Sequence, residues 1–251
     1  MSENRAEQTE SGPAAGREAA LKKLAQQRSS LLDAALRHVP FDGWTWTAID
    51  AGARDLALPA GEAHRLFPGG PQEVIRAFST AADRQMLESL EGLDLASMKV
   101  REKITAGVRA RLEAVAAHRE AVRSGLAFFA LPQNAATGMG CLYRTVDAIW
   151  YAAGDKATDY NFYTKRALLS GVYSSTLLFW LNDKSEDYAA TWAFLDRRIA
   201  EVLQVAGRLG KGVTAALNLP DRLFEKLAAR RREGSGRRTV GRGPLRSAAR
   251  R

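Results

Sequence analysis

The sequence predicts an all-α protein. From about Ala19 onward apolar residues recur three or four positions apart, which is the spacing of one buried helix face. Proline and glycine divide this pattern into segments of helical length, and no stretch alternates polar and apolar residues over the length of a strand. The 251 residues are 46% hydrophobic and 26% charged, which is enough for one large or two small domains with a buried core.

The N-terminal part, residues 18–90, is expected to hold four helices behind a disordered arm at residues 1–17. Apolar stripes and the breaks at proline and glycine place these helices at residues 18–38, 47–58, 59–66 and 71–90. The second and third are short and joined by a tight turn, which is a helix-turn-helix outline.

Residues 91–207 are expected to form a larger helical domain. Its helices are predicted at residues 97–131 with a hinge near His118, 134–151, 160–181 and 185–207. The side chains expected to cap them are Asn134, Thr158 or Asp159, and Ser185. Gly154 stands where a left-handed residue would end a helix. The uncharged runs at 124–143 and 167–182 are too broken or too short to span a bilayer.

The net charge of +9 belongs to the last 44 residues. Residues 1–207 carry 24 Lys and Arg against 25 Asp and Glu, whereas residues 208–251 carry 13 against 3. A basic tail on a neutral body favours an acidic partner, either phospholipid or nucleic acid. Residues 208–233 are expected to form an amphipathic, membrane-binding helix, and residues 234–251 a disordered Arg-rich tail. The apolar face of that helix is Leu217, Leu219, Leu223, Phe224 and Leu227. A rival interpretation docks this helix on the protein's own body.

Catalytic and metal-binding patterns are missing from the sequence, so we expect a protein that is not an enzyme and has no metal or cofactor. No phosphate-binding glycine loop, nucleophile elbow or zinc-protease motif is present, and the three histidines stand far apart. The single cysteine, Cys141, excludes an intramolecular disulfide and fits a reducing, intracellular compartment. Met139 and Leu142 near it favour a small buried residue over a nucleophile. The N-terminus resembles neither a secretory signal nor a transit peptide.

The helix-turn-helix outline is similar to that of the TetR-type transcriptional regulators. The corner at residues 63–67, followed by a glycine turn, resembles the end of their recognition helix. Residues 59–63 offer few side chains that reach bases, and Glu62 would repel phosphate. We therefore favour a purely structural role for this segment over the recognition of DNA bases. A TetR-type DNA-binding regulator with a lipid-like effector remains the alternative function.

Three motifs resemble a second family, the ubiquinone (coenzyme Q) biosynthesis accessory proteins called Coq nine. They are WYAAGD at residues 150–155, TDYNFYTKRALL at 158–169 and TWAFL at 191–195. The resemblance extends in layout over residues 28–207. It implies a TetR-like fold that binds lipid instead of DNA. It also implies a homodimer that forms through the last two core helices. It also implies an accessory protein that presents ubiquinone intermediates to the di-iron demethoxyubiquinone hydroxylase.

By this resemblance the ligand is an isoprenoid, a quinone or a phospholipid, DNA is not expected as a partner, and the protein is cytoplasmic and peripheral on the inner face of the membrane. The residues expected to line the lipid pocket are Phe128, Leu131, Tyr143, Tyr163, Ala167, Tyr173 and Leu177. The residues expected at the partner surface are Tyr143, Arg144, Asp147, Trp150 and Tyr151.

Elementary geometry supports part of this assignment. Trp150 and Tyr151 are adjacent in a helix and therefore about 100° apart, so at least one should be exposed or at an interface. Two interpretations stay open, since Trp150 could instead pack inward with Tyr151 covering its edge. Likewise, the small residues in the middle of the helix at 160–181 fit either a cavity or ordinary core packing.

Overall fold

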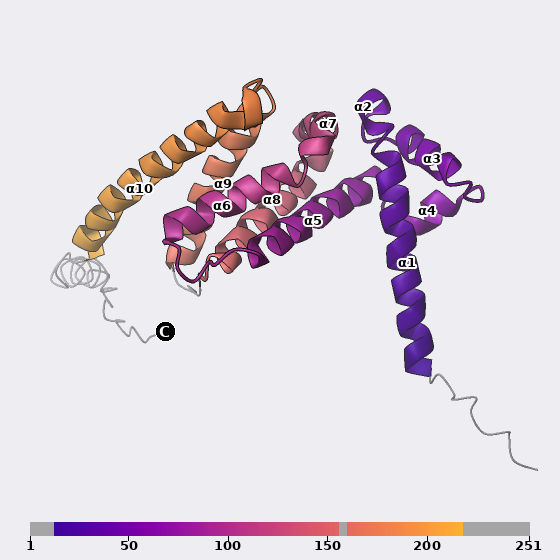
Figure 1. Cartoon of the computed structure of the whole chain (residues 1–251), viewed down its shortest axis with the longest axis horizontal. Coiled ribbons are helices and arrows are strands. Elements are labelled where there is room, and N and C mark those ends of the chain that lie inside the picture. Colours follow the sequence, from indigo (N-terminus) through magenta and orange to yellow (C-terminus); the bar gives the residue numbers. More distant parts are fainter. Residues whose placement is uncertain (1–12, 156–159, 218–251) are drawn as a thin grey trace, which may run out of the picture. The chain divides into compact units, whose positions relative to one another are not determined.

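The predicted fold class is confirmed. In a computed structural model that describes residues 13–155 and 160–217, every regular element of those residues is a helix (Figure 1). The helices are α1 Pro13–Ala35, α2 Val39–Asp42, α3 Trp46–Asp55, α4 Glu62–Leu66, α5 Gly70–Glu91, α6 Val100–Glu113, η1 Ala116–His118, α7 Arg119–Ala130, α8 Pro132–Ala152, α9 Tyr160–Trp180, η2 Glu186–Tyr188 and α10 Ala189–Leu217. None of these helices is long and apolar enough to cross a membrane.

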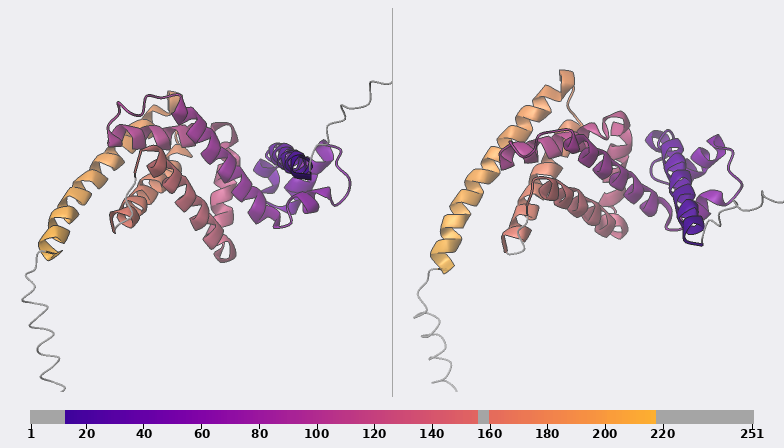
Figure 2. Two further views of the ribbon diagram at one scale, coloured as in Figure 1. Left: turned by 90° about the horizontal axis from the view of Figure 1, so that it is seen from below. Right: turned by 60° about the horizontal axis from the view of Figure 1, so that its bottom comes forward.

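The chain divides into a first unit that ends at Ala200 and a second that begins at Glu201, where α10 continues as a helix to Leu217. Within the first unit, α1 to α4 enclose a core with the start of α5 (Figure 2). Gly52 allows α1 and α3 to approach closely, because a Cβ atom there would lie 2.5 Å from the backbone nitrogen of Ala35. Trp44 joins this core to α7 by donating its indole N–H to the Ala121 carbonyl at 2.9 Å.

The N-terminal helices differ from prediction in two places. Helix α1 begins at Pro13, so residues 13–17 are helical and not part of an arm. Proline suits the first turn of a helix, where its missing N–H has no partner to lose. The same reason explains the short helix α2, which was not predicted and which has Pro40 in its first turn. Helix α4 lies inside the predicted helix at 59–66, whereas α3 begins one residue before the predicted helix at 47–58 and ends three residues earlier.

Helices α5, α6 and α8 pack side by side and form the body that α7 and α9 complete (Figure 1). The predicted hinge near His118 is confirmed by η1. Asn134 does not cap α8, which starts at Pro132. The Asn134 side chain instead donates to the carbonyl of Phe128 at 3.0 Å and accepts from Gln72 at 2.6 Å, which ties α8 to α7 and α5.

The left-handed residue predicted at Gly154 is confirmed, and Ser185 stabilises the start of α10 in a different way from the predicted cap. Gly154 has φ of 85°, in the left-handed region, just beyond the end of α8. Ser185 precedes η2 and forms no side-chain cap with it, but its hydroxyl accepts from the backbone N–H of Ala190 at 3.0 Å in the first turn of α10. Thr158 and Asp159 lie outside the described residues, as do residues 1–12 of the expected arm, residues 218–233 of the expected membrane-binding helix and residues 234–251 of the expected tail.

Candidate functional site

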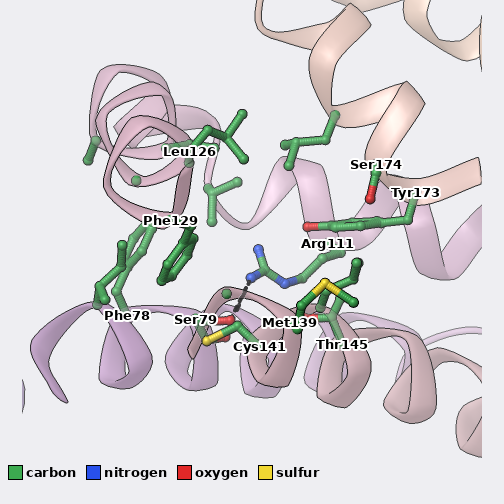
Figure 3. A pocket seen from close by; sticks show the side chains of 18 of the residues that line it. Phe78, Ser79, Arg111, Leu126, Phe129, Met139, Cys141, Thr145, Tyr173 and Ser174 are labelled. Atoms are coloured by element: carbon green, nitrogen blue, oxygen red, sulfur yellow. Dashed lines mark hydrogen bonds between the residues drawn. The ribbon is translucent and has the colours of Figure 1, made fainter. Parts of the chain in front are cut away.

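A cavity of about 290 Å³ lies where α5, α6, α7, α8 and α9 meet (Figure 3). Its wall is mainly apolar, with Phe78 from α5, Leu126 and Phe129 from α7, and Leu177 from α9. Met139 of α8 also lines the cavity and is 65% exposed, so the cavity reaches the molecular surface beside α8. A cavity of this composition suits an apolar ligand.

One part of the cavity wall is polar. Arg111 of α6 donates from Nε to Asp83 Oδ1 of α5 at 2.7 Å, and Thr145 of α8 donates its hydroxyl to the same oxygen at 2.7 Å. Arg111 also contacts the Ser79 hydroxyl at 3.4 Å. Burial alone would lower the pKa of Arg111, but the charges beside it, Asp83 among them, outweigh burial and raise its pKa. The Arg111 guanidinium therefore stays charged at the edge of an apolar cavity.

Tyr173 of α9 closes this polar wall. Burial raises the pKa of its phenol, although Arg111 opposes the change, so the hydroxyl is protonated at neutral pH. Figure 3 shows Arg111 reaching into the cavity between Phe129 and Tyr173. Cys141 also lines the cavity and is buried, with its sulfur accepting from Arg144 Nη2 at 3.4 Å.

The structure brings two of the seven residues expected in the lipid pocket to this cavity, Tyr173 and Leu177. The other five do not line it. Phe128 packs against the N-terminal core, and the remaining four are exposed, namely Leu131, Tyr143, Tyr163 and Ala167. On α7 and α8 the discrepancy is one residue, because Phe129 and Leu142 line the cavity in place of their neighbours.

The five residues expected at the partner surface lie along α8, mostly on its outer side. Tyr151 is 78% exposed, which confirms that at least one of the two adjacent aromatic residues is accessible. Trp150 is half-buried and donates its indole N–H to the Lys165 carbonyl at 3.2 Å. Tyr143 and Arg144 are exposed. The large apolar side chains of α8 that are exposed are Met139, Tyr143 and Tyr151, and the exposed Leu131 directly precedes the helix.

Asp147, the fifth of these residues, belongs to a cluster of charges between α8 and α9. Its carboxylate accepts from Arg166 at 2.6 Å, and Arg166 also contacts Asp155 at 3.3 Å. Lys165 donates to Asp155 at 2.7 Å. These ion pairs hold the start of α9 against the end of α8, and so connect the WYAAGD motif at residues 150–155 with the TDYNFYTKRALL motif at residues 158–169. They therefore fix the position of Trp150 and Tyr151.

The polar wall was not predicted, although the sequence contains a signal for it. Ser79 and Asp83 lie on the face of α5 that carries Met86 and Leu90. A charged residue therefore occupies a position where the helical repeat normally places an apolar one. Arg111 follows Val108 by three positions in the same way. Among the described residues, no cluster of three His, Cys, Asp or Glu side chains could hold a metal ion.

The helix-turn-helix region offers little to DNA. Helix α4 has five residues, and its arginine, Arg65, forms two hydrogen bonds to Glu62 at 2.6 and 2.8 Å. His64 stacks on Trp46 with ring centroids 3.7 Å apart. A recognition helix needs free donors and acceptors at base edges, and this helix uses its own within the protein.

Comparison with known proteins gives two results. Residues 135–206, which cover most of α8, all of α9 and part of α10, match the family model described as COQ9. The chain is 36% identical over 182 residues to "Ubiquinone biosynthesis protein COQ9, mitochondrial" of Drosophila melanogaster, covering 71% of this chain and 56% of that protein. It is 32% identical over 187 residues to the Homo sapiens protein of the same name, covering 72% and 58%. The chain thus spans less than two thirds of these relatives' length.

Among solved structures, the TetR transcriptional regulator from Nitrosomonas europaea has a TM-score of 0.58 and 23% identity. The match covers 71% of this chain and 99% of that one, and it shows the fold alone. These matches confirm the resemblance expected from the three motifs, and the chain is a relative of the COQ9 proteins with the helical fold of TetR regulators.

Proposed function

We propose that this chain is a non-enzymatic lipid-binding accessory protein of ubiquinone biosynthesis. The names of its COQ9 relatives support the biosynthetic role. The observation that carries the lipid-binding role is the apolar cavity, because two of its walls, α8 and α9, lie in the segment that matches the family model. The proposed ligand is an isoprenoid lipid or a quinone intermediate.

The outer side of α8 is the proposed meeting point with demethoxyubiquinone hydroxylase. Exposed aromatic residues are the common anchors of protein interfaces, and Tyr151 and Tyr143 are exposed on this helix. Met139 connects this surface to the cavity. A ligand leaving the cavity beside Met139 would therefore emerge next to the docked enzyme.

Membrane contact and self-association complete the proposal. The basic, amphipathic sequence at residues 208–233 supports attachment to an anionic membrane surface, on its cytoplasmic side. The exposed residues Leu178 and Phe179 of α9 support a homodimer interface, with Phe179 stacked on Phe194 of α10 at 4.5 Å between ring centroids. The relatives named above are mitochondrial by name.

The test is to identify lipid that accompanies the purified protein and to block the cavity. Leu126→Trp adds an indole where Leu126 lines the cavity, whereas Ala127→Trp adds the same group at an exposed neighbour. Mass spectrometry of solvent extracts should find isoprenoid, quinone or phospholipid with the wild type and with Ala127→Trp, and several-fold less with Leu126→Trp. Protein that carries no extractable lipid, or equal lipid in all three, would contradict the proposal.

A further inference from the structure

A second hollow of about 610 Å³ lies in the angle between α1 and α5, which meet near the start of α5 (Figure 1). We call it the α1–α5 cleft. Its bottom is apolar, because Leu32 of α1 and Phe67 are buried there and Ala77 of α5 is half-buried beside them. Leu21 and Leu24 line the side formed by α1. The cleft shares no lining residue with the lipid cavity and is a separate site.

The side of the cleft formed by α5 is positively charged. Arg76, Thr80 and Arg84 recur every four residues, which places them about 6 Å apart along the helix. Arg144 of α8 donates to the Thr80 hydroxyl at 3.2 Å, so it lies beside the middle position of this series. The three arginines form a row along one wall, here called the arginine row. The whole lining of the cleft holds four arginines against one glutamate.

The arginine row is only partly neutralised within the protein. The glutamate of the cleft, Glu73, bonds to the fourth arginine, Arg28, at 2.6 Å. Arg84 contacts Glu88 at 3.7 Å, but both side chains are exposed, and such pairs contribute little free energy. Among the residues that the structure describes, no carboxylate lies at ion-pair distance from Arg76 or from Arg144. The row can therefore bind carboxylates of a partner.

Helix α1 gives an independent reason to expect a partner in the cleft. From Ala15 to Ser30 none of its residues is buried, although the helix runs through them without a break. Leu21 is 57% exposed. A helical segment of this length is only marginally stable in water without packing. A partner that covers Leu21 and Leu24 would supply that packing.

The shape of the cleft favours a protein helix over a membrane or a nucleic acid. A flat bilayer surface would meet only the projecting side chains and would not reach Leu32 and Phe67 at the bottom. Nucleic acid would bind the arginines through its phosphates and leave the apolar bottom uncovered. A helix about 10 Å wide fits between two helices that diverge, and residues 73–84 of α5 offer it about 16 Å, or three turns.

We infer that the α1–α5 cleft binds an acidic amphipathic helix of another protein. Carboxylates four residues apart on that helix match the 6 Å repeat of the arginine row, and its apolar face covers Leu24, Ala77 and Phe67. The protein's own basic tail has the wrong charge for this role. Of the residues expected at the partner surface of α8, only Arg144 lines the cleft, so this is a second protein-binding surface. The inference does not depend on the lipid-binding proposal.

The test measures binding of a synthetic helix to the full-length protein by fluorescence anisotropy. The acidic peptide is alanine-based and about 18 residues long, with glutamates every four residues and leucines on the adjacent face. A second peptide has glutamine in place of each glutamate. The wild type should bind the acidic peptide about 10-fold or more tightly, because each exposed ion pair contributes about 2- to 5-fold. The basic tail also attracts this peptide, so variants in the cleft decide the test.

The first variant removes charge from the arginine row. Arg76→Gln with Arg144→Gln should weaken binding of the acidic peptide about 4- to 20-fold and leave binding of the glutamine peptide unchanged. Arg37→Gln with Arg54→Gln removes the same charge from exposed positions outside the cleft and is the matched control. The control should bind both peptides as the wild type does.

The second variant adds a carboxylate to the cleft. Ala25 is exposed and lines the cleft, whereas its exposed neighbour Gln26 does not. Ala25→Glu should weaken binding of the acidic peptide by about 10-fold, because the new carboxylate repels the peptide and competes for the arginines. Gln26→Glu should have little effect. Urea unfolding confirms that each variant is folded.

Three results would overturn the inference. The first is equal weakening by the two double arginine variants, which would assign peptide binding to overall charge and the tail. The second is undiminished binding of the acidic peptide by Ala25→Glu. The third is sedimentation with phosphatidylglycerol vesicles that Arg76→Gln with Arg144→Gln reduces while peptide binding stays unchanged, which would assign the cleft to the membrane. Lipid extraction tests the proposed function separately, since none of these variants changes the lipid cavity.

Discussion

The start of α10 offers the sharpest prediction about stability. The Asp183 carboxylate accepts four hydrogen bonds, from the backbone N–H and hydroxyl of Ser185 at 2.8 and 2.7 Å and from those of Thr191 at 2.9 and 2.6 Å. Burial would raise its pKa, but these hydrogen bonds outweigh burial and lower the pKa from 3.8 to about 2. Asp183→Asn keeps the shape of the side chain but replaces one acceptor by a donor.

The lowered pKa gives the size and the sign of the effect. A shift of this size corresponds to about 2 kcal/mol of stability, which screening by water reduces to about 1–2 kcal/mol. Because the folded-state pKa is depressed, this stability is present in full above the unfolded pKa and is lost as the pH falls toward 2. At pH 3 about half of it should remain.

The assay is urea unfolding of the wild type and Asp183→Asn between pH 7 and pH 3. The wild type should be more stable at pH 7 by about 1–2 kcal/mol, and the difference should shrink as the pH falls. Glu186→Gln, at an exposed position in the same segment, is the control and should show little change at any pH. A difference between wild type and Asp183→Asn that does not vary with pH would refute the reasoning.

Three further predictions concern packing, the partner and the membrane. Gly52→Ala should lower the free energy of unfolding by about 1–3 kcal/mol in urea titrations, because its Cβ would overlap the backbone of α1. Tyr151→Ala should weaken binding to demethoxyubiquinone hydroxylase in calorimetry by about 2 kcal/mol and leave the unfolding midpoint unchanged, because the side chain is exposed. Changing Leu223, Phe224 and Leu227 together to Ser, which leaves the net charge unchanged, should abolish most sedimentation with anionic liposomes, because about 1.5 kcal/mol or more of apolar transfer is lost per side chain. A destabilised Tyr151→Ala that still binds, or full sedimentation of the triple variant, would contradict the corresponding role.

Helix positions could be predicted from the sequence because apolar spacing and chain breaks are local signals. The errors fall where one residue type has two roles. A proline inside the chain usually predicts the end of a helix, yet Pro40 lies in the first turn of α2. Asn134 is predicted to cap a helix, yet Pro132 starts that helix two residues earlier. Which role such a residue takes depends on contacts that only the folded chain supplies.

The cavity could be predicted less well than the helices. Spacing identifies an apolar helix face, but where two adjacent residues are both apolar it does not say which one faces a ligand. Spacing therefore does not separate Phe128 and Tyr143 from their neighbours Phe129 and Leu142, which line the cavity. The buried pair of Asp83 and Arg111 joins two helices that are far apart in sequence. Its partners could not be paired from periodicity within either helix.

Two features that reduce stability coincide at the point where α5, α6, α8 and α9 meet. The residues that line a cavity make fewer contacts with one another than residues of a packed interior, and a buried ion pair loses hydration. Neither is needed to build a helical body, since α1 to α4 form a core of apolar residues without a buried ion pair among its members. A ligand that fills the cavity and shares the polar wall would recover part of both losses, and it would stabilise the folded chain in proportion to its concentration. The placement of both features on one cavity is therefore better explained by binding than by folding.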